Sequence, residues 1–170
     1  MNILNDFNTS VKKALTEIDS NWEKYPGLVI CGTHTPHDVG EMLNIIKKAR
    51  EATLPFLGIC FGHQLAAIEY SINVLGQDAT SEEFNSYGST GYYRGSQVVV
   101  VKRKEGLKVG LHEGESWWNN YEVIPGFESI WKKADNFITV QYHPEYQSSI
   151  DRPHSLLVSF LLYAKQKYEN

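Results

Sequence analysis

The chain has 170 residues, enough to bury a sizeable core, and its length suits a single domain covering residues 1–170. Hydrophobic residues make up 42% of the sequence and charged residues 21%, and the formal net charge is -4. The sequence has no run or stripe of lysine and arginine, so we expect no nucleic-acid partner. It has no apolar stretch long enough to span a bilayer, and its first residues do not resemble a secretory leader. We therefore expect no membrane association and a cytoplasmic protein.

The N-terminal segment predicts a helix. Apolar residues recur at helical spacing over residues 7–18, and Asp6 or Asn8 is placed to cap the first turn. The end of this segment, residues 16–18, also suits a short strand.

A strand, a helix, a second strand and a second helix follow. The apolar runs 28–31 and 56–59 predict buried strands, and residues 39–49 between them predict an amphipathic helix. Helical periodicity returns at Gly62. This βαβα order predicts a parallel sheet with right-handed crossovers, in which the carboxyl ends of the strands carry the site.

The second half predicts shorter strands. Residues 97–101, 119–123 and 137–141 read as strands separated by turns, and residues 156–164 predict a closing amphipathic helix. Together the elements predict an α/β protein with a mainly parallel central sheet and added short antiparallel strands.

The two cysteines, Cys31 and Cys60, each lie in a strand-like context, which argues against a disulfide framework. Cys31 is expected to be inert core. Cys60 stands at a strand-to-helix corner between Gly58 and Gly62, the arrangement of a nucleophile elbow, where a helix N-terminus favours the reactive thiolate. The alternative is that Cys60 is a small buried hydrophobe.

A histidine and a glutamate follow the predicted strand at 137–141. Tyr142 and His143 come directly after the strand end, and Pro144 pins a turn that brings Glu145 back toward the imidazole. A cysteine, a histidine base and an orienting carboxylate form a nucleophilic triad. The alternative is a solvated loop histidine beside a surface glutamate, and the presence of the Cys60 elbow favours the triad.

The loop before the predicted helix at 39–49 contains three residues of types that can bind a metal: His34, His37 and Asp38. A metal needs three or four convergent ligands of compatible type and spacing, which this short cluster does not supply. We expect a capped turn before the next helix, and we expect neither a metal nor another cofactor. We assign His63, which follows the elbow glycine, no catalytic role.

Two motifs together resemble the signature of class I glutamine amidotransferases. They are Gly58-Ile59-Cys60-Phe61-Gly62-His63-Gln64 and Gln141-Tyr142-His143-Pro144-Glu145. Segments 73–76, 79–84, 120–123 and 152–157 are similar to the amidotransferase domain of CTP synthase and its stand-alone relatives. The resemblance covers nearly the whole chain and implies a flavodoxin-like, three-layer sandwich.

The resemblance implies hydrolysis of the side-chain amide of glutamine. Cys60 would form a glutamyl thioester, His143 would act as acid and base, and Glu145 would orient His143. The ATP-dependent synthetase domain of CTP synthase has no counterpart in this sequence. The ammonia would therefore be released, or go to a separate synthetase acting in trans.

The resemblance also implies an oxyanion hole and a substrate pocket. The N–H groups of Phe61 and of Gly32 or Thr33 would bind the oxyanion. Gln64 and Glu83 would bind the glutamine substrate.

The sequence departs from the family in two places near this site. The loop at residues 31–34 reads Cys-Gly-Thr-His where the family has Pro-Gly-Gly, and residues 118–120 lack an arginine that CTP synthase places there. These departures leave two alternatives open. One is a hydrolase of a γ-glutamyl peptide or conjugate, and the other is a catalytically silent binding or regulatory module.

Overall fold

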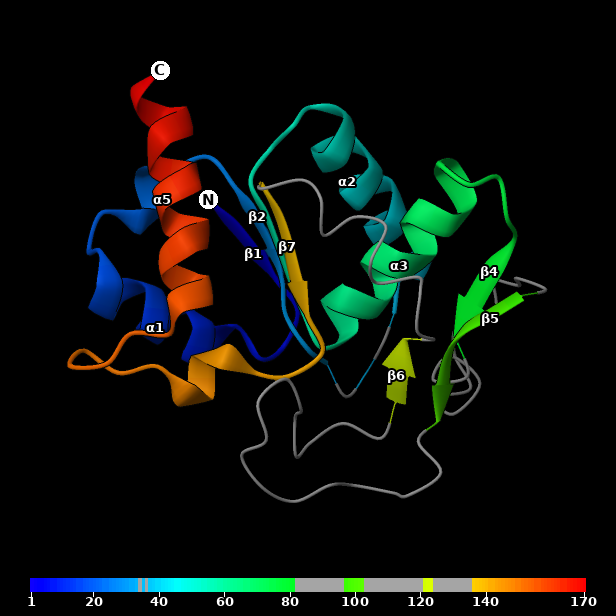
Figure 1. Ribbon diagram of the computed structural model, residues 1–170, viewed down its shortest axis with the longest axis horizontal. Helices are drawn as coiled ribbons and strands as arrows, with labels where there is room; N and C mark the ends of the chain where they lie inside the picture. Colours follow the sequence, from blue (N-terminus) through cyan, green and yellow to red (C-terminus); the bar gives the residue numbers. More distant parts are fainter. Residues whose placement is uncertain (34, 36, 82–96, 103–120, 124–135) are drawn as a thin grey trace.

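A four-stranded parallel sheet forms the centre of the computed structural model (Figure 1). The structure describes residues 1–33, 35, 37–81, 97–102, 121–123 and 136–170. The strand order is β1 (Asn2–Leu4), β2 (Leu28–Ile30), β3 (Phe56–Ile59) and β7 (Phe137–Val140). Because all neighbours are parallel, the carboxyl ends of β2, β3 and β7 lie at one edge of the sheet.

Helices cover both faces of this sheet (Figure 1). On one face lie α1 (Asn8–Ile18) and α5 (Ser155–Glu169). On the other face lie α2 (Val39–Glu51) and α3 (Phe61–Asn73). A mainly parallel sheet between two helical layers confirms the α/β sandwich predicted from the sequence.

A second, smaller sheet contains β4 (Ala79–Ser81), β5 (Gln97–Lys102) and β6 (Tyr121–Val123). β4 pairs with β5 in parallel, and β5 pairs with β6 antiparallel. The prediction of short, partly antiparallel strands in the second half is confirmed, whereas β4 was not predicted.

The N-terminal segment corrects two predictions. The residue at the N-cap of α1 is Phe7, and it makes no side-chain capping bond, so neither Asp6 nor Asn8 is the cap. Residues 16–18 continue the helix and form no strand, and the hydroxyl of Thr16 donates to the carbonyl of Lys12 one turn earlier.

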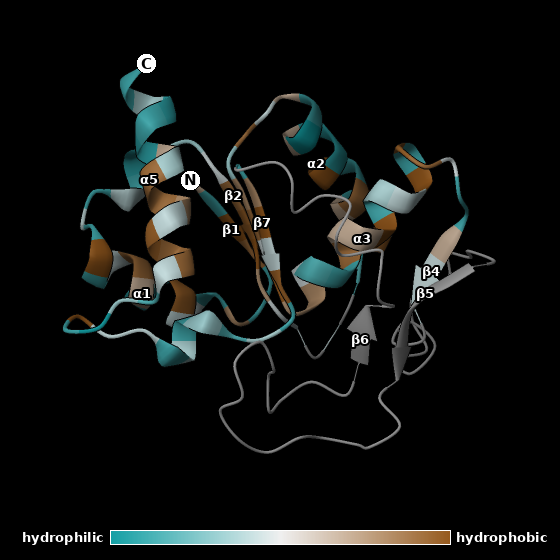
Figure 2. Ribbon diagram, in the orientation of Figure 1, coloured by the Kyte–Doolittle hydropathy of each residue, from teal (hydrophilic) through white to brown (hydrophobic). Residues whose placement is uncertain are grey.

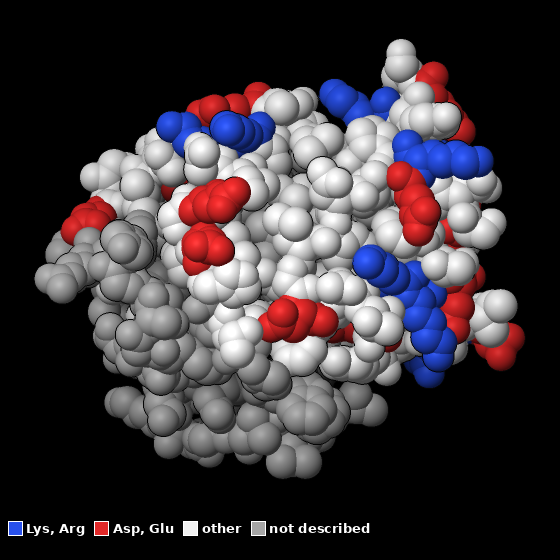
Figure 3. Space-filling view, turned by 180° about the vertical axis from the view of Figure 1, so that it is seen from behind, with Lys and Arg blue, Asp and Glu red and all other residues white. Residues whose placement is uncertain are grey.

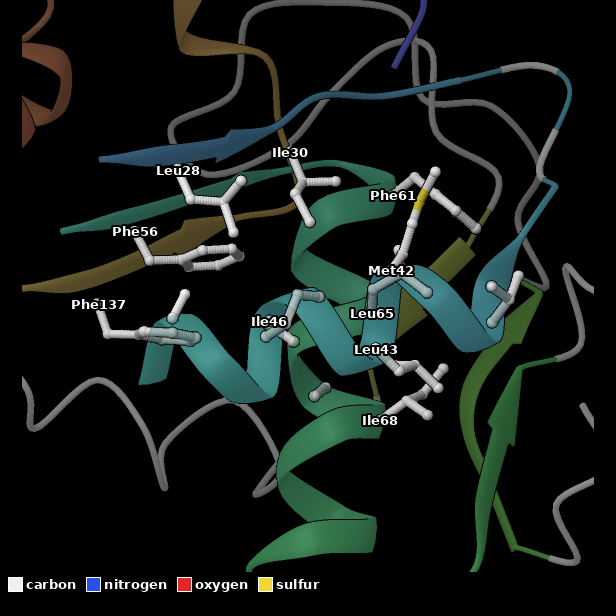
Figure 4. Packing of buried hydrophobic residues seen from close by; sticks show 14 of the residues in the cluster. Leu28, Ile30, Met42, Leu43, Ile46, Phe56, Phe61, Leu65, Ile68 and Phe137 are labelled. Carbon is white, nitrogen blue, oxygen red and sulfur yellow. The ribbon is translucent and has the colours of Figure 1, made fainter. Parts of the chain in front are cut away.

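Apolar side chains pack on both faces of the central sheet. The sheet strands and parts of the helices beside them are coloured as hydrophobic in Figure 2. On the face of α2 and α3, the side chains labelled in Figure 4 point toward one another between the helices and the strands. Phe56 and Phe137 stack there with ring centroids 4.2 Å apart. Each such large apolar side chain stabilises the fold by about 1.5–3 kcal/mol when fully buried. This packing fixes the strand ends that carry the candidate site.

An ion pair joins α2 to α3. The guanidinium of Arg50 donates through Nε and Nη2 to the carboxylate of Glu69, at 2.8 Å for the shortest contact. The side chain of Glu69 is fully buried, whereas that of Arg50 is 24% exposed. A buried carboxylate is costly unless it is paired, so this contact holds the two helices together.

Charges of both signs lie on the surface. Figure 3 shows Lys and Arg side chains interspersed with Asp and Glu side chains on one face of the molecule. Among the described helices, none has the length and apolar character needed to cross a lipid bilayer.

Candidate active site

Cys60 occupies the corner between β3 and α3. Its backbone has φ 55° and ψ -105°, a positive-φ conformation that non-glycine residues rarely adopt and that is often found at functional sites. α3 begins at the next residue, Phe61, so the N-terminal end of this helix lies beside the cysteine. This corner has the geometry predicted for a nucleophile elbow.

Two glycines let the elbow pack closely against the sheet. A Cβ on Gly62 would lie 2.1 Å from the carbonyl oxygen of Ile30. A Cβ on Gly58 would lie 2.8 Å from the carbonyl oxygen of Gly62. Both obstacles are backbone atoms, which cannot rotate away as a flexible side chain can. Glycine is therefore required at both positions for α3 to start directly against β2 and β3.

Hydrogen bonds join the elbow to the neighbouring strand β7. The N–H of Cys60 donates to the carbonyl of Val140 at 2.8 Å, which extends the β3–β7 ladder by one residue. Nδ1 of His63 lies 3.0 Å from Oγ1 of Thr139, and both side chains are buried. The contact gives His63 a structural role between α3 and β7.

His143 and Glu145 form a buried pair just beyond β7. Nδ1 of His143 lies 2.7 Å from Oε1 of Glu145. The short 3₁₀ helix η2 (Pro144–Gln147) carries the glutamate, and its first residue is the proline that was predicted to pin this turn. The Phe7 ring and the imidazole lie nearly perpendicular to each other, with ring centroids 6.0 Å apart. The imidazole is thus held by a carboxylate at Nδ1 and by an aromatic ring.

The loop after β2 packs against this histidine. A Cβ on Gly32 would lie 2.8 Å from Cδ2 of Phe7 and 3.1 Å from Cε1 of His143. The N–H of Phe7 donates to the carbonyl of Gly32 at 3.3 Å. Thr33 is buried, and its hydroxyl donates to the carboxylate of Asp6. The one glycine that this loop keeps is therefore the one that lies against the imidazole.

The described structure brings most of the predicted site residues to one edge of the sheet. Residues 32–33 follow β2, Cys60 and Phe61 follow β3, and His143 follows β7. Because β3 lies between β2 and β7, these three strand ends are neighbours. Glu83 lies outside the described residues, and its role in substrate binding stays a prediction.

Two glutamines near this edge have buried amides. Gln64 lies in the first turn of α3, and Gln141 follows β7 directly. In the part of the chain that the structure describes, the oxygen and nitrogen of both side-chain amides have no hydrogen-bond partner. A buried polar group without a partner costs about 1–3 kcal/mol, so both amides are candidates for bonding to a ligand. Gln141 was given no role of its own from the sequence, although this residue opens the second of the two family motifs and closes an apolar strand.

Cys31, the second cysteine, belongs to the core. It is fully buried in the apolar cluster beneath α1 and α5. Burial raises the pKa of this thiol well above its ordinary value, which keeps it in the protonated and unreactive form. The expectation that Cys31 is inert core agrees with this placement.

The turn before α2 contains His37 and Asp38, two of the three residues weighed as metal ligands. Nδ1 of His37 lies 2.8 Å from the carbonyl of Thr35, and the side chains of His37 and Asp38 are largely exposed. Asp38 has a left-handed backbone and makes no side-chain capping bond, so the turn is not capped in the predicted way. His34 lies outside the described residues. Within the described ranges, no three His, Cys, Asp or Glu side chains converge on a point that could hold a metal.

The fold is that of an α/β domain with a cysteine at a strand-to-helix elbow. The model of the family described as glutamine amidotransferase class-I matches residues 4–162, and the chain therefore belongs to this family.

Among relatives, CTP synthase of Encephalitozoon cuniculi is 31% identical over 182 residues, which cover 83% of this chain and 34% of that protein. CTP synthase of Flavobacterium psychrophilum is 29% identical over 195 residues, with 89% of this chain and 36% of that protein covered. The chain thus spans about a third of the length of the curated relatives it matches.

A solved structure has the same fold. The glutaminase domain of Trypanosoma brucei CTPS with bound acivicin superimposes with a TM-score of 0.69, and the match covers 97% of this chain and 92% of that chain. The two sequences are 20% identical, so this likeness supports the architecture.

Proposed function

We propose that this chain hydrolyses the side-chain amide of glutamine through a covalent intermediate on Cys60. Membership of the class I amidotransferase family and the elbow conformation of Cys60 support this proposal. The observation that carries it is the buried hydrogen bond between His143 and Glu145, at the strand end next to the elbow.

In the first half of the reaction, the thiolate of Cys60 attacks the amide carbon of glutamine and forms a C–S bond. The carbonyl oxygen becomes an oxyanion, which the N–H groups of Phe61 and of Gly32 or Thr33 stabilise. The C–N bond then breaks as protonated His143 delivers its proton to the leaving nitrogen. Ammonia leaves, and a glutamyl thioester remains on Cys60.

In the second half, His143 takes a proton from water, and the resulting hydroxide attacks the thioester carbon. The C–S bond breaks, glutamate leaves, and Cys60 is regenerated. Glu145 holds the imidazole by its Nδ1–H, which leaves Nε2 to exchange protons with substrate and water. Gln64 and Glu83 bind the polar groups of the substrate in this proposal.

The ammonia acceptor belongs to the same proposal. The CTP synthase relatives named above are about three times as long as this chain, and the solved structure that it resembles is a glutaminase domain. We propose that a synthetase on a separate polypeptide receives the ammonia, or that the ammonia is released.

Glutamate release from glutamine by the purified protein, alone and with cell extract, tests the proposal. Cys60→Ala and His143→Ala should each abolish release, whereas Cys31→Ala should leave it intact. Release that survives both site substitutions would rule out the mechanism. Release from γ-glutamyl peptides, but not from glutamine, would favour the γ-glutamyl hydrolase alternative, and no release from either would favour the silent module.

A further inference from the structure

Thr33 stands where class I amidotransferases usually have the second glycine of the oxyanion loop, and a threonine side chain must be accommodated there. In this structure the Thr33 side chain binds Asp6, just beyond β1. The hydroxyls of Thr33 and Thr35 both donate to Oδ2 of Asp6, the latter at 3.1 Å, and the N–H of Thr35 donates to Oγ1 of Thr33 at 3.0 Å. One carboxylate thus anchors the loop through two threonines.

The backbone of residues 31–33, which we call the oxyanion loop, is held from the same side. The side-chain amide of Asn5 donates to the carbonyl of Cys31 at 3.1 Å. The N–H of Phe7 donates to the carbonyl of Gly32 at 3.3 Å. Both carbonyls of the loop therefore face residues 5–7.

A trans peptide has its N–H pointing opposite to its C=O. The N–H of Gly32 shares a peptide plane with the carbonyl of Cys31, and the N–H of Thr33 shares one with the carbonyl of Gly32. With both carbonyls turned toward residues 5–7, both N–H groups point away from that segment.

The opposite side is the side of the elbow. β2 lies between β1 and β3, residues 5–7 follow β1, and Cys60 follows β3. In this strand order, the side of β2 away from β1 is the side of β3, whose strand end carries Cys60.

We propose that Asp6 is a positioning residue that turns the N–H groups of Gly32 and Thr33 toward the oxyanion formed at Cys60. The inference rests on the amidotransferase function proposed above. Asp6 draws the Thr33 side chain out of the site, so that a threonine serves where the family uses glycine.

Misplacing these N–H groups should weaken the binding of the transition state and leave the binding of the substrate nearly unchanged. The oxyanion exists only during the reaction, so a misplaced donor lowers kcat and leaves substrate binding nearly unchanged. Losing one oxyanion donor costs about 10²- to 10³-fold in kcat. Loosening the loop should cost about 10- to 100-fold, with KM changed no more than about twofold.

The test compares Asp6→Ala and Thr33→Val with the conservative variant Thr33→Ser, which keeps the hydroxyl. Asp19→Ala is the matched control, because Asp19 also accepts a hydroxyl hydrogen bond, from Tyr25 at 2.7 Å, but lies at the other end of α1. Two quantities are measured: kcat and KM for glutamine hydrolysis, and amide hydrogen exchange of peptides covering residues 30–33. Thermal melting identifies variants that fail to fold.

We expect Asp6→Ala and Thr33→Val to lower kcat and to speed exchange in the loop, Thr33→Ser to lower kcat less than Thr33→Val does, and Asp19→Ala to behave like the wild type. Unchanged exchange and a kcat within twofold in both disruptive variants would overturn the inference, as would a loss confined to KM. If the wild type hydrolyses no glutamine, the proposed function fails. The exchange result would still decide whether Asp6 holds the loop.

Discussion

Oε1 of Glu145 lies 2.7 Å from Nδ1 of His143, and both side chains are buried at the end of β7. This contact occupies Nδ1 and leaves Nε2 as the nitrogen for the proton transfers of the proposed reaction. It also places a negative charge where the imidazolium forms during the proposed reaction.

Glu145→Gln should lower kcat for glutamine hydrolysis by about 10²- to 10⁴-fold, because the amide keeps the hydrogen bond but no longer stabilises the imidazolium. Steady-state kinetics measure the effect. Glu51→Gln, at the exposed end of α2, is the control and should have no effect. A Glu145→Gln enzyme with kcat within threefold of the wild type would exclude the proposed role.

Gly62→Ala should destabilise the fold by at least about 2 kcal/mol, because its Cβ would meet the carbonyl oxygen of Ile30 at 2.1 Å and force α3 from the sheet. Gly40→Ala is the matched control, since its Cβ would meet nothing within 4 Å in the first turn of α2. That substitution should stabilise by about 0.5–1 kcal/mol through the helix propensity of alanine. Urea unfolding measures both. Equal effects of the two substitutions would contradict the close packing of the elbow.

Arg50→Met should destabilise by about 2–3 kcal/mol, because it leaves the fully buried carboxylate of Glu69 without its partner. The value lies below that of a fully buried pair because Arg50 is partly exposed. Lys13→Met breaks a surface pair between the exposed Lys13 and the partly exposed Glu17, at 3.8 Å, and should change stability by less than about 0.5 kcal/mol. Adding Glu69→Leu to Arg50→Met should restore part of the loss. If the two single substitutions cost the same, the ion pair between α2 and α3 contributes no more than a surface pair.

His154 makes the start of α5 sensitive to acid. Its Nδ1 accepts a hydrogen bond from the N–H of Leu156 at 3.2 Å, and burial lowers the pKa of the imidazole below its ordinary value of 6.5. The Tyr142 ring lies 5.8 Å away, and the charge of Glu145 opposes the shift without cancelling it. The unfolded chain therefore binds a proton more readily, so this contribution to stability is present above pH 6.5 and is lost as the pH falls.

His154→Asn should flatten this pH dependence, because asparagine can cap a helix without titrating. The free energy of unfolding measured at pH 8 and pH 5 should fall more in the wild type than in the variant. Identical differences for the two proteins would show that His154 does not contribute.

The central elements could be predicted because their patterns are local. The apolar runs at 28–31 and 56–59 and the helical spacing at 39–49 predicted β2, β3 and α2 to within a few residues. The strand β4 was missed because its three residues are too few to show an alternating pattern.

The contacts that shape the site could not be read from the sequence. Thr33 and Asp6 are 27 residues apart, and Arg50 and Glu69 are 19 apart, so no local pattern links them. The predicted N-cap of α1, Asp6 or Asn8, was wrong because a contact between distant residues is involved there too. The N–H of Phe7 is used by the carbonyl of Gly32, and this tertiary contact sets where the helix begins.

The most direct test of the central claim is covalent labelling with a glutamine-analogue diazoketone, read by mass spectrometry of the intact protein and of its peptides. We expect one adduct per chain, on Cys60, with glutamine slowing its formation and His143→Ala suppressing it. Buried Cys31 serves as the internal control and should stay unlabelled. No adduct on Cys60, or equal labelling of both cysteines, would contradict a glutamine-specific nucleophile at this elbow.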